Sequence, residues 1–174
     1  ARLGTGSFQP FAGAASTTDS AGAPLAALML GVNDFGERMN LVLGPDREPL
    51  KPWLAAVVAA ARGHDLLAID GVVNATDDAD RLQTECLQGR AFGFDGKSLI
   101  HPAQIDAANA AFSPSPDEVA KAHEVVAAFA AADAEGKGAI RVGYRMVERL
   151  HLDAAHRLLA RHEAASTPPG DRPI

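Results

Sequence analysis

Cysteine and aromatic residues are scarce in this sequence. Cys86 is the only cysteine, and aromatic side chains make up 5% of the chain. A single cysteine excludes an intrachain disulfide and a zinc site built from cysteines, and it favours the cytoplasm as the compartment. The N-terminus lacks the charged-then-apolar order of a signal peptide, and no apolar run approaches the roughly 18 residues of a membrane span. We therefore expect no membrane partner.

Positive charge is also in short supply. The 22 acidic residues outnumber the 16 basic ones, the net charge is −6, and no basic cluster occurs. This balance argues against nucleic acid as a partner. An anionic substrate would need a local cationic site or a metal ion, because the overall field of the protein repels it.

What the sequence does contain is an alternation of short apolar runs and helical patterns. The 174 residues are enough for one domain with a hydrophobic core, and the alanine-rich apolar fraction of 47% favours a helix-rich α/β protein. The alternation predicts parallel strands joined by crossover helices. The predicted strands are residues 25–30, 66–69 and 91–94, and the predicted helices between them are residues 52–63 and 76–89, with Leu82 and Leu87 as core contacts.

Beyond the third predicted strand the pattern becomes helical. Residues 104–112 predict a short helix, and the sequence SPDE from Ser115 is a strong start signal for a helix that runs to about residue 135. Residues 139–147 fit a short strand or hairpin, and a last helix covers about residues 151–162. We divide the chain into an irregular head (1–24), βα units (25–113), a helical extension (114–165) and a tail (166–174).

Acidic residues follow two of the predicted strands, at the sheet edge where α/β proteins place their chemistry. Asp34 follows the first strand and is a candidate ligand for a hard cation such as Mg²⁺. The alternative is an aspartate that caps a helix. Asp70 ends the second strand and is either a second acidic group at the same edge or a turn residue before Gly71.

The most informative segment is GFDGKSLIHPAQI, which begins at Gly93. A strand that delivers cationic groups to the start of a helix commonly builds an anion site in an α/β protein. Lys97 and His101 are therefore candidates for holding a phosphate or carboxylate, and Gln104 offers both a donor and an acceptor nearby. The alternative is an ordinary strand-to-helix turn with solvated side chains.

In their order and spacing these pieces resemble the citrate lyase beta-subunit-like family of acyl-CoA lyases, within the wider aldolase/citrate lyase group. The matching segments lie between about residues 25 and 160. They are LGVNDF from Leu30, AIDG from Ala68, GFDGK from Gly93, IHPAQI from Ile100 and MVE from Met146. The resemblance implies a TIM-type (β/α)8 barrel with a C-terminal helical extension, assembled as a homotrimer.

The resemblance also implies site residues and an activity. Asp34 matches the family's Mg²⁺-binding aspartate, and Glu148 stands where many members carry an aspartate that serves as acid or base in a neighbouring subunit's site. The implied reaction is cleavage of a 3-hydroxyacyl-CoA, of the citryl-CoA or malyl-CoA type, to acetyl-CoA and a keto acid. The alternatives are a malyl-CoA-type thioesterase and a non-catalytic assembly subunit. We assign substrate or CoA binding to Asp70, Lys97, Ile100, His101, Pro102 and Gln104.

The sequence departs from the family pattern in its first part. A complete barrel needs about 250 residues, and only the last three βα units are recognisable here. The family's metal-binding Glu and substrate-binding Arg have no counterpart before Asp34. We expect the N-terminal half to be absent from this sequence rather than the protein to be degenerate, because half a barrel exposes sheet edges and apolar faces.

Overall fold

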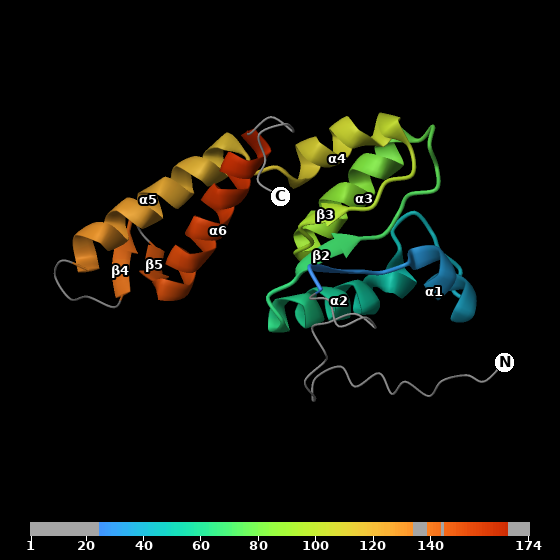
Figure 1. Ribbon diagram of the computed structural model, residues 1–174, viewed down its shortest axis with the longest axis horizontal. Helices are drawn as coiled ribbons and strands as arrows, with labels where there is room; N and C mark the ends of the chain where they lie inside the picture. The colour runs from blue at the N-terminus through green and yellow to red at the C-terminus, as the bar shows by residue number, and fades with distance from the viewer. Residues whose placement is uncertain (1–24, 134–138, 144, 167–174) are drawn as a thin grey trace. The chain divides into compact units, whose positions relative to one another are not determined.

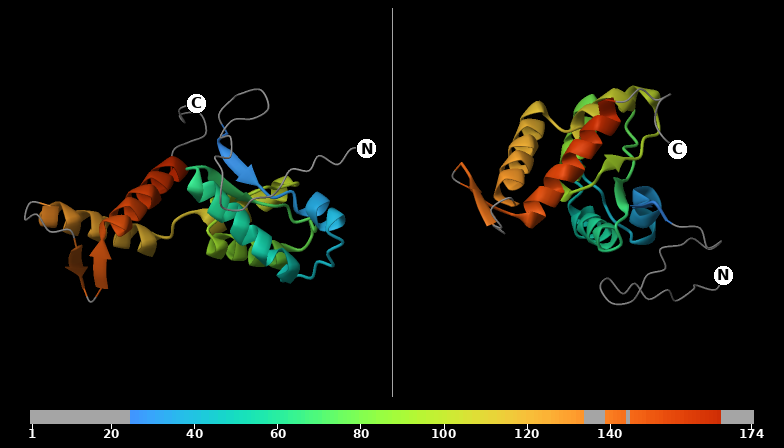
Figure 2. Two further views of the ribbon diagram at one scale, coloured as in Figure 1. Left: turned by 90° about the horizontal axis from the view of Figure 1, so that it is seen from below. Right: turned by 60° about the vertical axis from the view of Figure 1, so that its left-hand side comes forward.

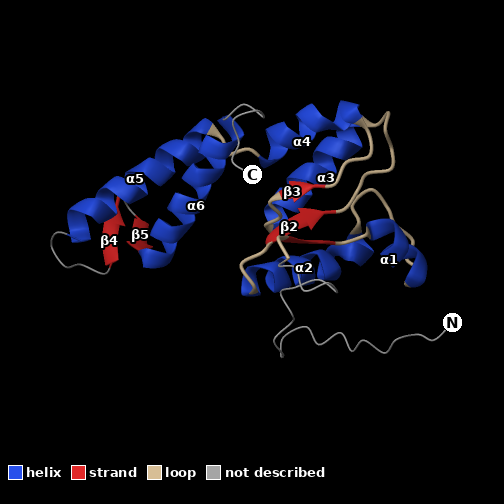
Figure 3. Cartoon of the chain, in the orientation of Figure 1, coloured by secondary structure: helices blue, strands red, loops and turns tan. Residues whose placement is uncertain are grey.

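The computed structural model describes residues 25–133, 139–143 and 145–166 of the chain. The chain divides into two compact units between Phe112 and Ser113 (Figure 1). The first unit is a parallel sheet with helices, and the second is built from two long helices and a β-hairpin (Figure 3). Within the described residues no helix is both long enough and apolar enough to cross a membrane.

The sheet of the first unit has three parallel strands in the order β1-β2-β3. They are β1 (Ala27–Met29), β2 (Leu67–Asp70) and β3 (Gly96–Lys97). Met29 is the register partner of Ile69, and Asp70 is the register partner of Lys97. All three strands therefore end at one edge of the sheet, and the prediction of an α/β protein with a parallel sheet is confirmed.

The helices of the first unit follow the strands in turn. They are α1 (Val32–Arg38), α2 (Lys51–Gly63), α3 (Ala79–Phe92) and α4 (Ile105–Phe112), with short 3-10 turns at Glu48–Leu50 and Pro102–Gln104. Helix α2 packs against β1 and β2, and α3 packs against β3, α2 and α4 (Figures 1 and 2). The Phe35 ring of α1 meets the Trp53 ring of α2 edge to face, with centroids 5.0 Å apart.

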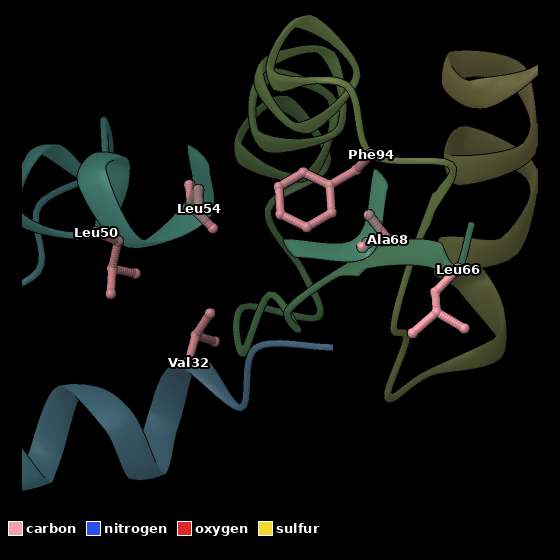
Figure 4. Close-up of a cluster of buried hydrophobic side chains, with 7 residues drawn as sticks. Val32, Leu50, Leu54, Leu66, Ala68 and Phe94 are labelled. Atoms are coloured by element: carbon pink, nitrogen blue, oxygen red, sulfur yellow. The ribbon is translucent and has the colours of Figure 1, made fainter. Parts of the chain in front are cut away.

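The main hydrophobic core lies between α2 and the sheet (Figure 4). Side chains alternate between the faces of a strand, so Ala68, which is fully buried in this core, and Asp70 both point toward the helices. Leu67 is 51% exposed on the opposite face. Burial of each large core side chain stabilises the fold by about 1.5–3 kcal/mol. The buried members of the core are Val32, Leu50, Leu54, Ala61, Leu66, Ala68 and Phe94.

The prediction of a third strand at residues 91–94 is wrong. Helix α3 continues to Phe92 and ends at Gly93, whose φ of 97° is left-handed and suits glycine at a helix end. Phe94 is then buried, and the strand begins only at Gly96. Leu87, a predicted core residue, is 51% exposed. The buried face of α3 consists instead of Leu82, Glu85, Cys86 and Gly89.

The second unit is a helical hairpin with a two-stranded sheet. Helices α5 (Pro116–Asp133) and α6 (Arg149–Ser166) pack against each other, and β4 (Ala139–Val142) pairs antiparallel with β5 (Arg145–Glu148) between them in the chain (Figures 1 and 2). The predicted start of α5 is confirmed. The Ser115 hydroxyl accepts from the Glu118 N–H at 3.3 Å, and the Glu118 carboxylate accepts from the Ser115 N–H at 2.8 Å. The predicted helix end near residue 135 lies outside the described residues.

Candidate functional site at the carboxyl edge of the sheet

A pocket of about 160 Å³ opens beyond the carboxyl ends of β1 and β2. Gly71 forms part of its wall in a position that admits only glycine. A Cβ atom there would lie 2.3 Å from Val32 Cγ1 and 2.8 Å from the Leu30 carbonyl oxygen. The end of β2 therefore rests directly on the connection between β1 and α1. The lining residues are Met29, Leu30, Gly31, Val32, Asn33, Asp34, Gly71 and Val72.

Asp34 brings the carboxylate of this pocket. It lies in the first turn of α1 and is exposed, and the helix is capped at Gly31 without a side-chain bond. In the described part of the chain, the Asp34 carboxylate has no hydrogen-bond or ion-pair partner, and nowhere do three or more His, Cys, Asp or Glu side chains gather as a metal site. A Mg²⁺ ion takes one or two protein carboxylates together with substrate oxygens and water. Asp34 fits as one such ligand, and a second carboxylate would have to come from elsewhere.

Two asparagines join the connections above this pocket. The Asn33 amide donates to Asn74 Oδ1 at 3.1 Å, and the Asn74 amide donates to Asn33 Oδ1 at 2.8 Å. This reciprocal pair ties the β1–α1 connection to the β2–α3 connection, although both side chains are exposed. The residue that precedes Asp34 is thereby held in place from the neighbouring strand.

Four charged side chains form a buried cluster between the sheet and α3, here called the charge cluster: Arg47, Asp70, Glu85 and Lys97. Arg47 Nη1 lies 3.0 Å from both oxygens of Asp70, and Lys97 Nζ lies 2.9 Å from Asp70 Oδ2. Glu85 Oε2 lies 3.4 Å from Arg47 and 3.5 Å from Lys97. The four side chains are between 0 and 4% exposed, and a third cation, Arg81 of α3, which is 37% exposed, reaches the cluster with its Nε 3.1 Å from Glu85 Oε1.

The backbone around the charge cluster is shaped to bring these groups together. Arg47 adopts a left-handed conformation, with φ 53°, which costs a non-glycine residue about 1–2 kcal/mol. Its other donors bind Gln88 Oε1 at 2.8 Å and the Glu85 carbonyl at 3.3 Å, which offsets that cost. Burial beside the cluster raises the pKa of the Cys86 thiol above its ordinary value, and the positive charge of Lys97 lowers it by a smaller amount.

Asp70 and Lys97 therefore lie in surroundings that differ from those expected. Asp70 lies at the carboxyl end of β2, the sheet edge expected for it, but its side chain is fully buried and paired on the helix side of the strand. The Lys97 ammonium, expected to meet an anionic ligand, is likewise fully buried against Asp70 and Glu85. No described buried side-chain nitrogen or oxygen lacks a hydrogen-bond partner, which the low polarity of the site requires.

The turn after β3 carries the other predicted ligand residues. Ile100 is 51% exposed, and His101 and Pro102 are exposed beside it. Gln104 differs, since it is 2% exposed and both ends of its amide are used internally. Its oxygen accepts from the Ile100 N–H at 3.1 Å and its nitrogen donates to the Val73 carbonyl at 3.1 Å. Gln104 thus braces the turn against the β2–α3 connection.

Glu148 belongs to the second unit, at the last position of β5 and directly before α6. Its side chain is exposed, and its carboxylate has no partner among the residues that the structure describes. Its backbone N–H donates to His151 Nδ1 at 3.0 Å. The imidazole three residues on therefore accepts the backbone N–H of the residue before α6, as the third helical side chain does in a capping box.

The sequence predicted two members of the charge cluster and missed the other two. Arg47 lies in a connection rich in proline and glycine and meets Asp70 across 23 residues of chain, which no local pattern reveals. Glu85 did carry a signal. It falls on the same face of α3 as Leu82 and Cys86, and a carboxylate on an apolar helix face needs a buried partner.

The fold and this pocket define a class of protein. An acidic side chain and a glycine-lined pocket lie beyond the carboxyl ends of parallel strands, which is where α/β proteins bind their ligands. The family model described as HpcH/HpaI aldolase/citrate lyase matches residues 16–102. The chain belongs to the HpcH/HpaI aldolase/citrate lyase family, which confirms the resemblance drawn from the sequence motifs.

Individual relatives are enzymes of CoA esters. The chain is 44% identical over 140 residues to a (3S)-malyl-CoA thioesterase of Cereibacter sphaeroides, an alignment that covers 80% of the chain and 49% of the relative. It is 33% identical over 158 residues to an L-malyl-CoA/beta-methylmalyl-CoA lyase of Rhodobacter capsulatus, covering 81% of the chain and 50% of that relative. The chain thus spans about half the length of the curated relatives it matches.

Solved structures give the same picture of the fold. The protein CitE of Mycobacterium tuberculosis, in complex with magnesium, acetoacetate and coenzyme A, matches with a TM-score of 0.64 and 28% identity over 82% of this chain and 54% of its own. A citrate lyase of Burkholderia xenovorans matches with a TM-score of 0.67 and 23% identity over 85% of this chain and 48% of its own, a likeness of fold.

Proposed function

We propose that this chain is the carboxyl-terminal part of an enzyme that hydrolyses a malyl-CoA-type thioester. The observation that carries the proposal is the Asp34 carboxylate, which has no partner among the described residues and lies in a pocket at the carboxyl edge of the sheet, in a chain that is 44% identical to a (3S)-malyl-CoA thioesterase. Hydrolysis takes precedence over the carbon–carbon cleavage expected from the sequence, because the relatives described as lyases are less similar, at 33% identity. The proposal includes a complete (β/α)8 barrel, assembled as a homotrimer.

The residues of this chain would divide the work between binding and proton transfer. Asp34 would be one ligand of Mg²⁺, which polarises substrate oxygens when bound. Ile100, His101 and Pro102, on the exposed turn after β3, would contact the CoA moiety. Glu148, contributed by a neighbouring subunit, would accept a proton from the attacking water. The water oxygen then bonds to the thioester carbon, the carbon–sulfur bond breaks, and the CoA thiolate takes up a proton.

A lyase is the second candidate, and the 33% identity to the malyl-CoA lyase of R. capsulatus favours it. In that reaction the bond between the hydroxyl-bearing carbon and the carbon next to the thioester carbonyl breaks. The products are an oxo acid and an acetyl-CoA enolate, and a carboxylic acid at position 148 returns a proton to the enolate carbon.

Product analysis separates the two candidates. The complete protein is incubated with malyl-CoA and Mg²⁺, and products are resolved by liquid chromatography with mass detection. Free CoA together with intact malate supports the thioesterase, whereas acetyl-CoA together with an oxo acid supports the lyase. If neither set of products forms, both candidates are excluded and a non-catalytic subunit is favoured. A parallel incubation with acetyl-CoA controls for general thioester hydrolysis.

A further inference from the structure

Asp70 contacts both of the segments to which the proposed function assigns ligand binding. Its Oδ1 accepts from the Gly71 N–H at 2.8 Å, and Gly71 lines the pocket that contains Asp34. Its Oδ2 lies 2.9 Å from the Lys97 ammonium, and its carbonyl oxygen accepts from the Ser98 N–H at 2.9 Å. One buried residue is therefore bonded to the wall of the pocket and to the first residues of the turn after β3.

The backbone at Gly71 has little room to move on the side of the pocket. The missing Cβ of Gly71 would overlap Val32 and the Leu30 carbonyl, so its backbone is already in close contact with the β1–α1 connection. A shift of the Asp70 carboxylate that releases the Gly71 N–H changes how this wall rests against the segment that carries Asp34. On the other side, Lys97 holds the end of β3 beside β2 at the point where the chain enters the turn.

We propose that Asp70 and Lys97 are positioning residues that set the pocket wall and the CoA-binding turn relative to each other. The proposal rests on the proposed function and changes the role expected for these two residues, since neither side chain is exposed to a ligand. Their ion pair acts through Gly71 and through residues 98–101. Supporting groups of this kind typically change ligand affinity or activity by roughly 10–100-fold when replaced.

The test compares Lys97→Met with Arg62→Met in the complete protein. Arg62 of α2 makes a second ion pair, with a residue just before β3: its guanidinium lies 2.8 Å from Asp95, which accepts from the Ala68 N–H of β2 at 2.9 Å. Neither partner contacts the pocket, so Arg62→Met removes an ion pair without removing a contact of Asp70 or Lys97. Lys97→Met should raise the KM for malyl-CoA by about tenfold or more, and Arg62→Met should change it by less than about threefold.

Amide hydrogen exchange gives a readout that does not depend on activity. In Lys97→Met, peptides that cover residues 71–74 and 98–101 should gain about tenfold more in exchange rate than the peptides of α2, which report the loss of global stability. Arg62→Met should not produce this pattern. An equal gain in exchange rate across all peptides of the first unit in Lys97→Met, or equal KM values in the two variants, would overturn the positioning role. The wild-type products test the proposed function separately, so the two can fail independently.

Discussion

The Lys97 ammonium lies 2.9 Å from the Asp70 carboxylate, and neither side chain is exposed to solvent. The Asp70 carboxylate is the shortest contact of Lys97 in the charge cluster, so a change at either residue leaves the other as a buried charge that has lost a direct partner. Lys97→Met or Asp70→Asn alone should lower the free energy of unfolding by about 3–5 kcal/mol. The double variant removes both members of the pair and should lose clearly less than the sum. Urea unfolding of the four proteins measures this coupling, and strictly additive losses would contradict it.

The Asp70 carboxylate packs so closely against α3 that position 89 must be a glycine. A Cβ there would lie 2.8 Å from Asp70 Oδ2 and 3.4 Å from the Phe112 ring. Alanine normally stabilises a helix relative to glycine by up to about 1 kcal/mol, but Gly89→Ala should instead destabilise the protein by about 1–3 kcal/mol. Gly63→Ala is the matched control, because it also lies in a helix and has nothing within 4 Å of its missing Cβ. Thermal unfolding should separate the two variants in opposite directions.

The buried thiol of Cys86 predicts a pH dependence. Burial raises the pKa of Cys86, so the folded protein holds the thiol proton more tightly than the unfolded chain does. The resulting stabilisation is present below the unfolded pKa of about 8.5 and is lost as the pH rises through the folded pKa. Between about pH 8 and 10, the wild type should therefore lose stability more steeply than Cys86→Ala. Parallel slopes in urea titrations of the two proteins would remove Cys86 as the cause.

Neutralising Asp34 and neutralising Glu148 should change different kinetic quantities, the first the Mg²⁺ requirement and the second kcat. Asp34→Asn removes a Mg²⁺ ligand and should raise the Mg²⁺ concentration needed for half-maximal activity by about tenfold or more. Glu148→Gln should leave that concentration unchanged and reduce kcat by about 10²–10⁴-fold, because it removes the proton-transfer group. Magnesium titrations of steady-state turnover in the complete protein measure both. A Glu148→Gln variant with wild-type kcat would remove this residue from the mechanism.

Local patterns were sufficient to predict two of the three strands and most of the helices, but they did not predict α1. The apolar runs before Asp34 and Asp70 give β1 and β2, and the Ser115 capping signal gives the start of α5. The third strand was misplaced because Phe92 and Phe94 read as an apolar run, although Gly93 between them ends a helix. Hydropathy does not distinguish these two outcomes, and the positive φ of the glycine decides between them.

The charge cluster was beyond prediction for a different reason. Its pairings join residues 12 to 38 positions apart, and Arg47, Asp70 and Lys97, each taken alone, look like ordinary solvated charges. Lys97 in particular follows a glycine in a segment typical of anion binding, and only the sheet register shows that it faces Asp70. Motifs pointed to segments of the chain, whereas the division into exposed and buried polar groups depended on tertiary contacts.

The bond between His151 and the Glu148 backbone has a consequence for recognition. Nδ1 of His151 is engaged by the Glu148 N–H, so of the two ring nitrogens only Nε2 is left for a contact with another molecule. The exposed imidazole therefore offers its Nε2 edge three residues from the carboxylate to which we assign proton transfer.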